Sequence, residues 1–303
     1  MAPEGCSKTS GQALSMKFAN LYHLNAWLIR PATMRADCAF VELLTDSPLV
    51  PKWFVSHWWG EVVLEFVESV RQHQAVRRLS RDDAYWVCAH ANRQHSLDEE
   101  LTADPRETSF FKAMGLARGV LLILNRESEH AKPAVAFSRI WCNFEEATTV
   151  KMRHLLLDIA HCGREGRAVV LTEGTSPLDE LREDPIKAKT AREREFPIEV
   201  FRTGLGVTIE RGEATSEADR RRILNTVAGR SVQELDREPP GEHGNYEHVN
   251  RRLRATLAIA LAPQAASRGA VSDFGVLGTI AEDAGREDLS LCLSGWGEPR
   301  ALE

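Results

Sequence analysis

The sequence predicts an α/β domain in which helices cover both faces of a five-stranded parallel β-sheet. Short apolar runs recur along residues 50–229, each the length of a buried strand. Amphipathic segments with apolar residues three and four positions apart separate several of these runs. Strands that alternate with helices form βα units, and their right-handed crossovers build a parallel sheet.

The first strand is predicted at Trp53–Val55, where apolar side chains occupy both strand faces. A polar and aromatic turn follows at once and ends in Gly60, before a helix predicted from about Glu61 to Gln74. A buried strand that runs into such a turn at the start of a helix is typical of a ligand-facing loop. The sequence around Ser56–Gly60 is therefore the first place where a binding site is expected.

The later elements follow the same alternation. Further strands are predicted at residues 84–89, 119–124, 167–172 and 206–210, and helices are predicted to begin near Thr108, Ser138 and Ser216. Gly229 can terminate the last of these helices. This spacing suits a flavodoxin-like three-layer fold, whose ligands bind where the strand order reverses.

Several segments lie outside the regular alternation. We expect a disordered N-terminus, an ordered lead-in that packs against the domain, a charged insertion, a linker and a C-terminal helical extension, at residues 1–17, 18–49, 173–203, 230–244 and 245–262. Pro263 is expected to stop the last helix. Residues 263–303 form a tail whose strand-like alternation from residue 288 can be read as the first unit of a repeat array.

Composition excludes several function classes. A net charge of −6 gives no electrostatic basis for binding nucleic acid or an anionic membrane. No apolar run has the length of a membrane span, and the N-terminus lacks the apolar region of a signal peptide. The six cysteines are scattered along a long chain, which favours reduced thiols and a cytoplasmic protein.

Two motifs carry a resemblance to a known family. Phe54-Val-Ser-His57 has the form of a hydrophobic pair followed by Ser and His, and Trp141-Cys-x-x-Glu145 opens a helix after the apolar strand Val120–Leu124. Residues 50–160 thereby resemble a divergent Toll/interleukin-1 receptor (TIR) domain. The whole chain is also similar to multidomain proteins of unicellular algae in which such a block precedes repeats.

The resemblance implies an activity for one carboxylate. Enzymatic TIR domains cleave NAD⁺ at the nicotinamide–ribose bond with a Glu in the third-helix motif, which is Glu145 in this sequence. An anion suits this chemistry because the transition state resembles an oxocarbenium ion. Trp141 and Cys142 lie four and three positions earlier and can share its helix face, with Trp141 as an aromatic wall. The alternative is that Trp141 and Cys142 belong to the core and Glu145 is a solvated residue beside Glu146.

Further residues are candidates to bind the nucleotide. The turn after the first strand would line the pocket, with N–H groups near Gly60 facing a phosphate, and three arginines in or beside the flanking loops could contact the pyrophosphate; these residues are Ser56, His57, Trp58, Trp59, Gly60, Arg93, Arg126 and Arg139. The alternative for each arginine is solvation at the surface. For Trp58 and Trp59 it is packing against the lead-in.

Other chemistries are less well supported by the residues. Cys88, His90 and His95 suggest zinc, but no fourth ligand follows at a typical spacing, so we predict neither a metal site nor a bound cofactor. Adjacent Ser56 and His57 would project to opposite faces of a strand, which disfavours a hydrolase dyad. Two hypotheses remain open: an NAD⁺ glycohydrolase, and a non-enzymatic scaffold that associates with other copies through the same fold.

Overall fold

The structure is a computed structural model of the 303-residue chain, and it describes residues 15–100, 102–129, 131–197, 200, 206 and 208–268. Its centre is a five-stranded sheet formed by β1 (Pro51–His57), β2 (Ala84–Trp86), β3 (Gly119–Leu124), β4 (Leu156–Cys162) and β5 (Ala168–Leu171). The α/β class is thereby confirmed.

The strands are ordered β2-β1-β3-β4-β5. β1 pairs in parallel with β2 and with β3, and β3 pairs in parallel with β4. The last pair, β4 with β5, is antiparallel, so the prediction of an entirely parallel sheet is wrong for one strand. Because the chain places β2 on one side of β1 and β3 on the other, the strand order reverses beside the carboxyl end of β1.

The predicted strand positions need two corrections. β4 lies at Leu156–Cys162, where no strand was predicted, because buried Asp158 and His161 interrupt its apolar pattern. The strand predicted at 206–210 is absent where the chain is described, since Ile209–Arg211 form a 3₁₀ turn. The backbone N–H of Ile209 donates to the side-chain oxygen of Asn250, so it is not available for a hydrogen bond to a neighbouring strand.

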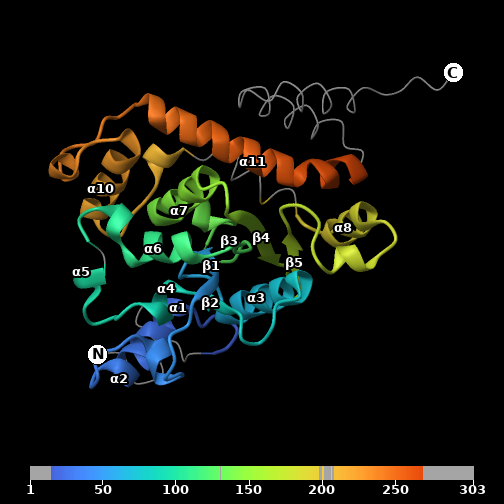
Figure 1. Ribbon diagram of the computed structural model, residues 1–303, viewed down its shortest axis with the longest axis horizontal. Helices are drawn as coiled ribbons and strands as arrows, with labels where there is room; N and C mark the ends of the chain where they lie inside the picture. The colour runs from blue at the N-terminus through green and yellow to red at the C-terminus, as the bar shows by residue number, and fades with distance from the viewer. Residues whose placement is uncertain are drawn as a thin grey trace.

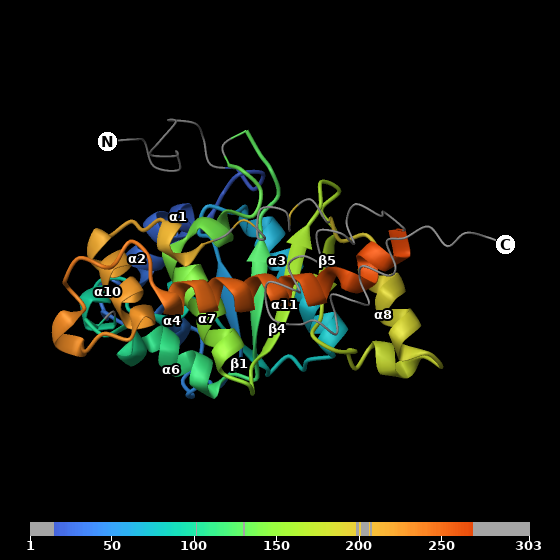
Figure 2. The same ribbon diagram turned by 90° about the horizontal axis from the view of Figure 1, so that it is seen from above.

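Helices cover both faces of the sheet (Figure 1). α6 (Ser109–Leu116), α7 (Ile140–Lys151) and α11 (Gly244–Arg268) lie on one face, and α3 (Val63–Arg77) lies on the other. The alternation of side chains along β1 divides the core accordingly, because Phe54 packs towards the first group of helices and Val55 towards the second. Figure 2 shows α11 crossing the length of the sheet.

The remaining elements are short, apart from α8 and α10. They are α1 (Leu21–Leu24), the π-helix η1 (Asn25–Ile29), α2 (Arg30–Thr33), α4 (Cys88–Ala91), α5 (Leu97–Glu100), α8 (Pro185–Glu193), α10 (Glu217–Ala228) and the 3₁₀ helices η2 (Phe40–Leu43), η3 (Pro105–Glu107), η4 (Val135–Ser138), η5 (Asp179–Leu181), η6 (Ile209–Arg211) and η7 (Val232–Glu234). The charged insertion thus carries a helix of nine residues rather than one turn.

Local signals placed several helix ends correctly. The side chains of Thr108 and Ser216 cap α6 and α10, and Gly229 ends α10 with a left-handed φ of 83°. Pro263 does not stop the C-terminal helix, which continues to Arg268. Residues 1–14 and 269–303 lie outside the described residues. Most of the segment predicted to be disordered, and most of the predicted repeat-like tail, fall in these two ranges.

The lead-in contains a helical segment from Leu21 to Thr33. Its middle turn is a π-helix just before Pro31. Proline has no backbone N–H to donate to the carbonyl oxygen of Trp27, and its ring would clash with that carbonyl in a regular α-helix. Leu21 and Ile29 are buried in the same core cluster as Val55. Of the helices in the described ranges, none is long and apolar enough to cross a membrane.

Candidate functional site

The candidate site lies where the carboxyl end of β1 meets α7. Ser56 and His57 are the last residues of β1, held in register with Leu122 and Ile123 of β3. The thiol of Cys142 on α7 donates to the carbonyl oxygen of His57, with a sulfur–oxygen distance of 3.6 Å. This contact turns the face of α7 that carries Cys142 towards the end of β1. Cys142 is also part of the buried core.

Glu145 lies one helical turn further along α7 and is only 4% exposed. Burial raises the pKa of its carboxyl group to about 8, and the nearby Ser56 hydroxyl partly opposes the rise. That hydroxyl is close without being aligned, since its oxygen forms no hydrogen bond of standard geometry. The alternative that Glu145 is a solvated helix residue is therefore wrong, and the neighbouring Glu146 is buried as well.

Unsatisfied polar atoms gather around this point. Both ring nitrogens of His57, the hydroxyl of Ser56 and one carboxyl oxygen each of Glu61 and Glu146 are buried without a hydrogen-bond partner. Buried polar atoms are nearly always hydrogen-bonded to protein or water. Several buried polar atoms without a partner in one place therefore indicate a site suited to a polar ligand.

His57 and Glu61 form an unexpected pair. The Nδ1 atom of His57 lies 4.0 Å from a carboxyl oxygen of Glu61, four residues later in the chain. Burial lowers the pKa of His57 to about 3, so its ring is neutral at pH 7, and burial raises the pKa of Glu61 well above its usual value. Glu61 and Glu146 are site residues that the sequence did not predict. The position of Glu61 directly after the turn was the signal that could have identified it.

The aromatic turn after β1 is occupied by contacts within the protein. The ring of Trp59 lies 5.5 Å from that of Tyr22 in the lead-in, centroid to centroid, and its indole N–H donates to the sulfur of Cys88. Trp58 lies over Gly60 so closely that a Cβ atom on that glycine would overlap its indole. Trp59 therefore packs against the lead-in, which is the alternative to ligand binding.

Helix α3 does not present all of its first N–H groups to a ligand. The N–H of Val63 donates to the carbonyl oxygen of Ala19 over 2.8 Å, and the N–H of Glu65 donates to that of Val62. The lead-in thus occupies part of the helix terminus that the sequence suggested for a phosphate.

The other predicted binding residues do not converge on Glu145. Trp141 stacks on Phe110 and donates its indole N–H to Asp219, on the side of α7 that faces α6 and α10. The three arginines all have protein partners: Arg93 pairs with Glu99, Arg126 with Glu65, and Arg139 with Thr215 and Glu213. Arg139 occupies the N-cap position of α7. Burial raises the pKa of Tyr22, and the positive charge of Arg139 partly opposes that rise.

The zinc alternative is not supported by the geometry. The Nε2–H of His95 donates to the carbonyl oxygen of Arg30 over 2.8 Å, while His90 packs against Phe40 and Cys88 against Trp59. Within the described part of the chain, no group of three or more His, Cys, Asp or Glu residues could hold a metal ion.

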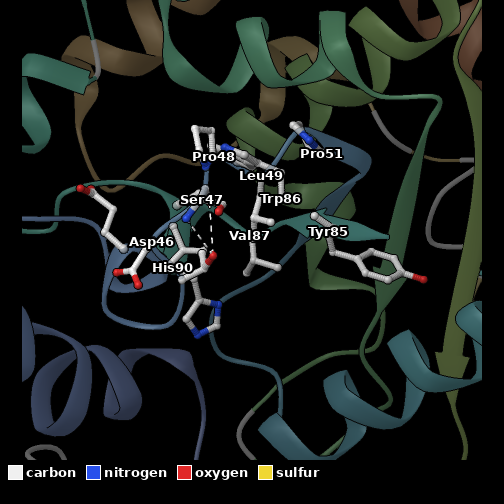
Figure 3. Close-up of a pocket in the computed structure, with 14 residues that line it drawn as sticks. Asp46, Ser47, Pro48, Leu49, Pro51, Tyr85, Trp86, Val87 and His90 are labelled. Carbon is white, nitrogen blue, oxygen red and sulfur yellow. Dashed lines mark hydrogen bonds between the residues drawn. The ribbon is translucent and has the colours of Figure 1, made fainter. Parts of the chain in front are cut away.

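A cavity of about 470 Å³ lies elsewhere, along the free edge of β2 (Figure 3). Segments 41–51 and 84–91 line it, and Figure 3 shows the Tyr85 ring extending away from Asp46 and Ser47. A second cavity of about 260 Å³ lies among β4, α8 and α11. Glu145 lines neither of these two cavities, so its carboxyl group is enclosed in this conformation.

Comparison of the chain with models of protein families, with curated proteins and with solved structures finds no match in any of the three.

Proposed function

We propose that this chain is a TIR-like domain of flavodoxin-like fold that hydrolyses NAD⁺ at the nicotinamide–ribose bond, with Glu145 as the catalytic carboxylate. The observation that carries the proposal is the burial of Glu145 beside Ser56 and Cys142, at the carboxyl end of β1 where the strand order reverses. Open α/β sheets bind ligands at such switch points. The order β2-β1-β3-β4-β5 is also compatible with the flavodoxin-like class.

The chemistry requires an anion beside the ribose. As the bond from C1′ to the nicotinamide nitrogen breaks, its electron pair leaves with the nicotinamide and positive charge develops on the ribose. An ionised Glu145 would stabilise that charge, and water would then bond to C1′ and release a proton. A pKa of about 8 keeps Glu145 mostly protonated at pH 7 in the closed site. The positive charge of the bound pyridinium ring would favour its ionised form.

The direct test is release of nicotinamide and ADP-ribose from NAD⁺ by the purified chain, measured in dilute and in clustered samples. Glu145→Gln keeps the side-chain shape and removes the carboxylate, so it should abolish release while folding is unchanged. Glu127→Gln is the matched control, since Glu127 is exposed just after β3 and should retain full activity. Equal activity in Glu145→Gln and the unaltered chain would exclude Glu145 as the catalytic group.

A non-enzymatic association module is the second candidate, and one surface favours it. The free edge of β2 runs beside a groove lined in part by exposed Leu49, and Leu43, Leu44 and Val50 are exposed in the same segment. Exposed apolar residues beside an unpaired strand edge are typical of protein contacts. If no sample consumes NAD⁺ and Leu49→Asp changes the sedimentation of a self-associating chain, this function replaces the enzymatic one.

A further inference from the structure

The lead-in contacts the loop after β1 at three points. The N–H of Leu21 donates to the carbonyl oxygen of Trp59 over 2.9 Å, and the carbonyl oxygen of Ala19 accepts from the N–H of Val63 over 2.8 Å. In addition, the ring of Tyr22 packs on the ring of Trp59. Both the backbone and the side chain of Trp59 are therefore held by the lead-in.

The same segment also contacts the loop after β2. The carbonyl oxygen of Arg30 lies 2.8 Å from Nε2 of His95, and the carboxylate of Asp37 accepts from the hydroxyl of Ser96 over 2.9 Å. The loops after β1 and β2 both follow the carboxyl ends of parallel strands, where ligands of such sheets bind. Residues 19–37 thus connect the two loops that would have to admit a ligand.

Tyr22 reaches the candidate site itself. Its hydroxyl is close enough to Cys88, Cys142 and Arg139 for each of them to influence it electrostatically. Cys142 contacts the end of β1, and Cys88 is covered by the indole of Trp59. The lead-in therefore packs on Trp59, which in turn contacts Cys88, beside the end of β1 where Glu145 is buried.

The lead-in is attached less completely than the sheet. Its π-helical turn leaves the side-chain oxygen of Asn25 and the indole nitrogen of Trp27 buried without partners. Tyr22, Leu28 and Met34 are 46%, 50% and 66% exposed, so only part of its apolar surface is buried. A segment with few buried contacts and unsatisfied polar groups opens at lower cost than a core strand.

We infer that residues 19–37 are a strap that closes the candidate site, and that this strap must move away from Trp59 before a ligand reaches Glu145. The catalytic consequence rests on the proposed function, whereas the movement does not. A binding partner that takes up Leu21 and Tyr22 would therefore switch the site on.

The test measures access separately from activity. Full-length Leu21→Ala and Leu28→Ala are compared with the unaltered chain, because Leu21 is 3% exposed and Leu28 is 50% exposed on the same strap. Alkylation of each cysteine by a maleimide is followed by mass spectrometry. Cys88 reports on the strap, and buried Cys162 on β4 reports on the fold as a whole.

We expect Leu21→Ala to speed alkylation of Cys88 at least fivefold and to raise NAD⁺ consumption, with Cys162 unchanged and Leu28→Ala like the unaltered chain. An unchanged rate at Cys88 overturns the strap. If both thiols react faster in Leu21→Ala, the whole fold has loosened, and Tyr22→Ala becomes the deciding variant. Faster alkylation of Cys88 alone in Tyr22→Ala supports the strap, and any other result overturns it. Faster alkylation of Cys88 without NAD⁺ consumption retains the strap and counts against the proposed function.

Discussion

The indole N–H of Trp59 donates to the thiol sulfur of Cys88, with a nitrogen–sulfur distance of 2.9 Å. This bond joins the loop after β1 to α4, the first element after β2, so the two loops beside the candidate site are held as one unit. Burial raises the pKa of Cys88 to about 12, although the Trp59 bond acts in the opposite direction, so the thiol is protonated and unreactive at pH 7.

Replacing Trp59 with Phe removes this hydrogen bond and retains an aromatic ring against Tyr22. The expected loss is about 1 kcal/mol in the free energy of unfolding, measured with urea, because one neutral hydrogen bond is removed. Because the bond acts to lower the pKa of the Cys88 thiol, its loss should also slow alkylation of Cys88. Trp141→Phe is the matched control, since it too loses an indole hydrogen bond, to Asp219. If Cys88 reacts equally fast in both variants, the Trp59 bond does not influence its reactivity.

Glu145 should make the protein less stable as the pH rises. Its pKa is about 8 in the folded chain and 4.5 without the protein environment, so between these values the folded state binds more protons than the unfolded state. Its favourable contribution is present below about pH 4.5 and is lost as the pH rises to about 8, at about 1.4 kcal/mol per pH unit. The free energy of unfolding, measured with urea from pH 5 to pH 8, should therefore fall.

Glu145→Gln should reduce that slope and make the protein more stable than the unaltered chain at pH 8. Glu61 and Glu146 also have pKa values raised well above normal by burial, so part of the slope should remain. Exposed Glu127→Gln should leave the slope unchanged. An identical slope in Glu145→Gln and the unaltered chain would mean that Glu145 is ionised in the folded protein.

Apolar runs and caps predicted most of the sheet because they depend on nearby residues. β1 and β3 are nearly continuous apolar segments, and Thr108 and Ser216 cap their helices through contacts three residues away. β4 escaped prediction because Asp158 is acceptable in a buried strand only through partners on α3, more than eighty residues earlier. A local pattern does not contain that information.

The candidate site was predicted in part for the same reason. The motif around Cys142 and Glu145 identified a helix that does face the end of β1. Sequence alone did not indicate that Trp141 turns towards Asp219 or that the lead-in covers Trp59, because both depend on which distant segments meet in space. Nor did it indicate that Glu61 would be buried beside His57.

The buried network around Asp158 should be essential for stability. Arg77 donates to both carboxyl oxygens, over 2.7 and 2.6 Å, and His73 lies 2.9 Å from one of them. Burial alone would raise the pKa of Asp158, but these hydrogen bonds outweigh it and lower the pKa. Asp158→Asn leaves the Arg77 charge buried without its counter-ion, which should cost about 3–5 kcal/mol in the free energy of unfolding.

Glu165→Gln provides the comparison for Asp158→Asn. Glu165 and Arg167 form an ion pair at 2.7 Å, but both side chains are almost fully exposed. Water and salt screen such pairs, so the urea midpoint should not change measurably. Equal midpoints in the two variants would show that Asp158 does not hold α3 to β4.

Gly60 should be required because Trp58 occupies the space where a side chain would begin. A Cβ atom there would overlap the indole, and the backbone of Gly60 does not have a left-handed φ, so the conflict is with the ring alone. Gly60→Ala should therefore cost about 1–3 kcal/mol in the free energy of unfolding, as overpacking does. Gly115→Ala in α6 is the control, because nothing lies within 4 Å of its added Cβ, and it should stabilise the helix by about 0.5–1 kcal/mol.

The double variant identifies the cause. When Trp58→Ala removes the ring, adding Gly60→Ala should cost less than it does in the presence of Trp58, so the two effects should not be additive. Additive losses would place the strain elsewhere in the turn. Because the indole is absent from the Trp58→Ala background, comparison of that single variant with the double variant isolates the effect of the added Cβ atom. A destabilisation by Gly60→Ala that disappears with the ring would assign to Gly60 the role of making room for Trp58 over the turn.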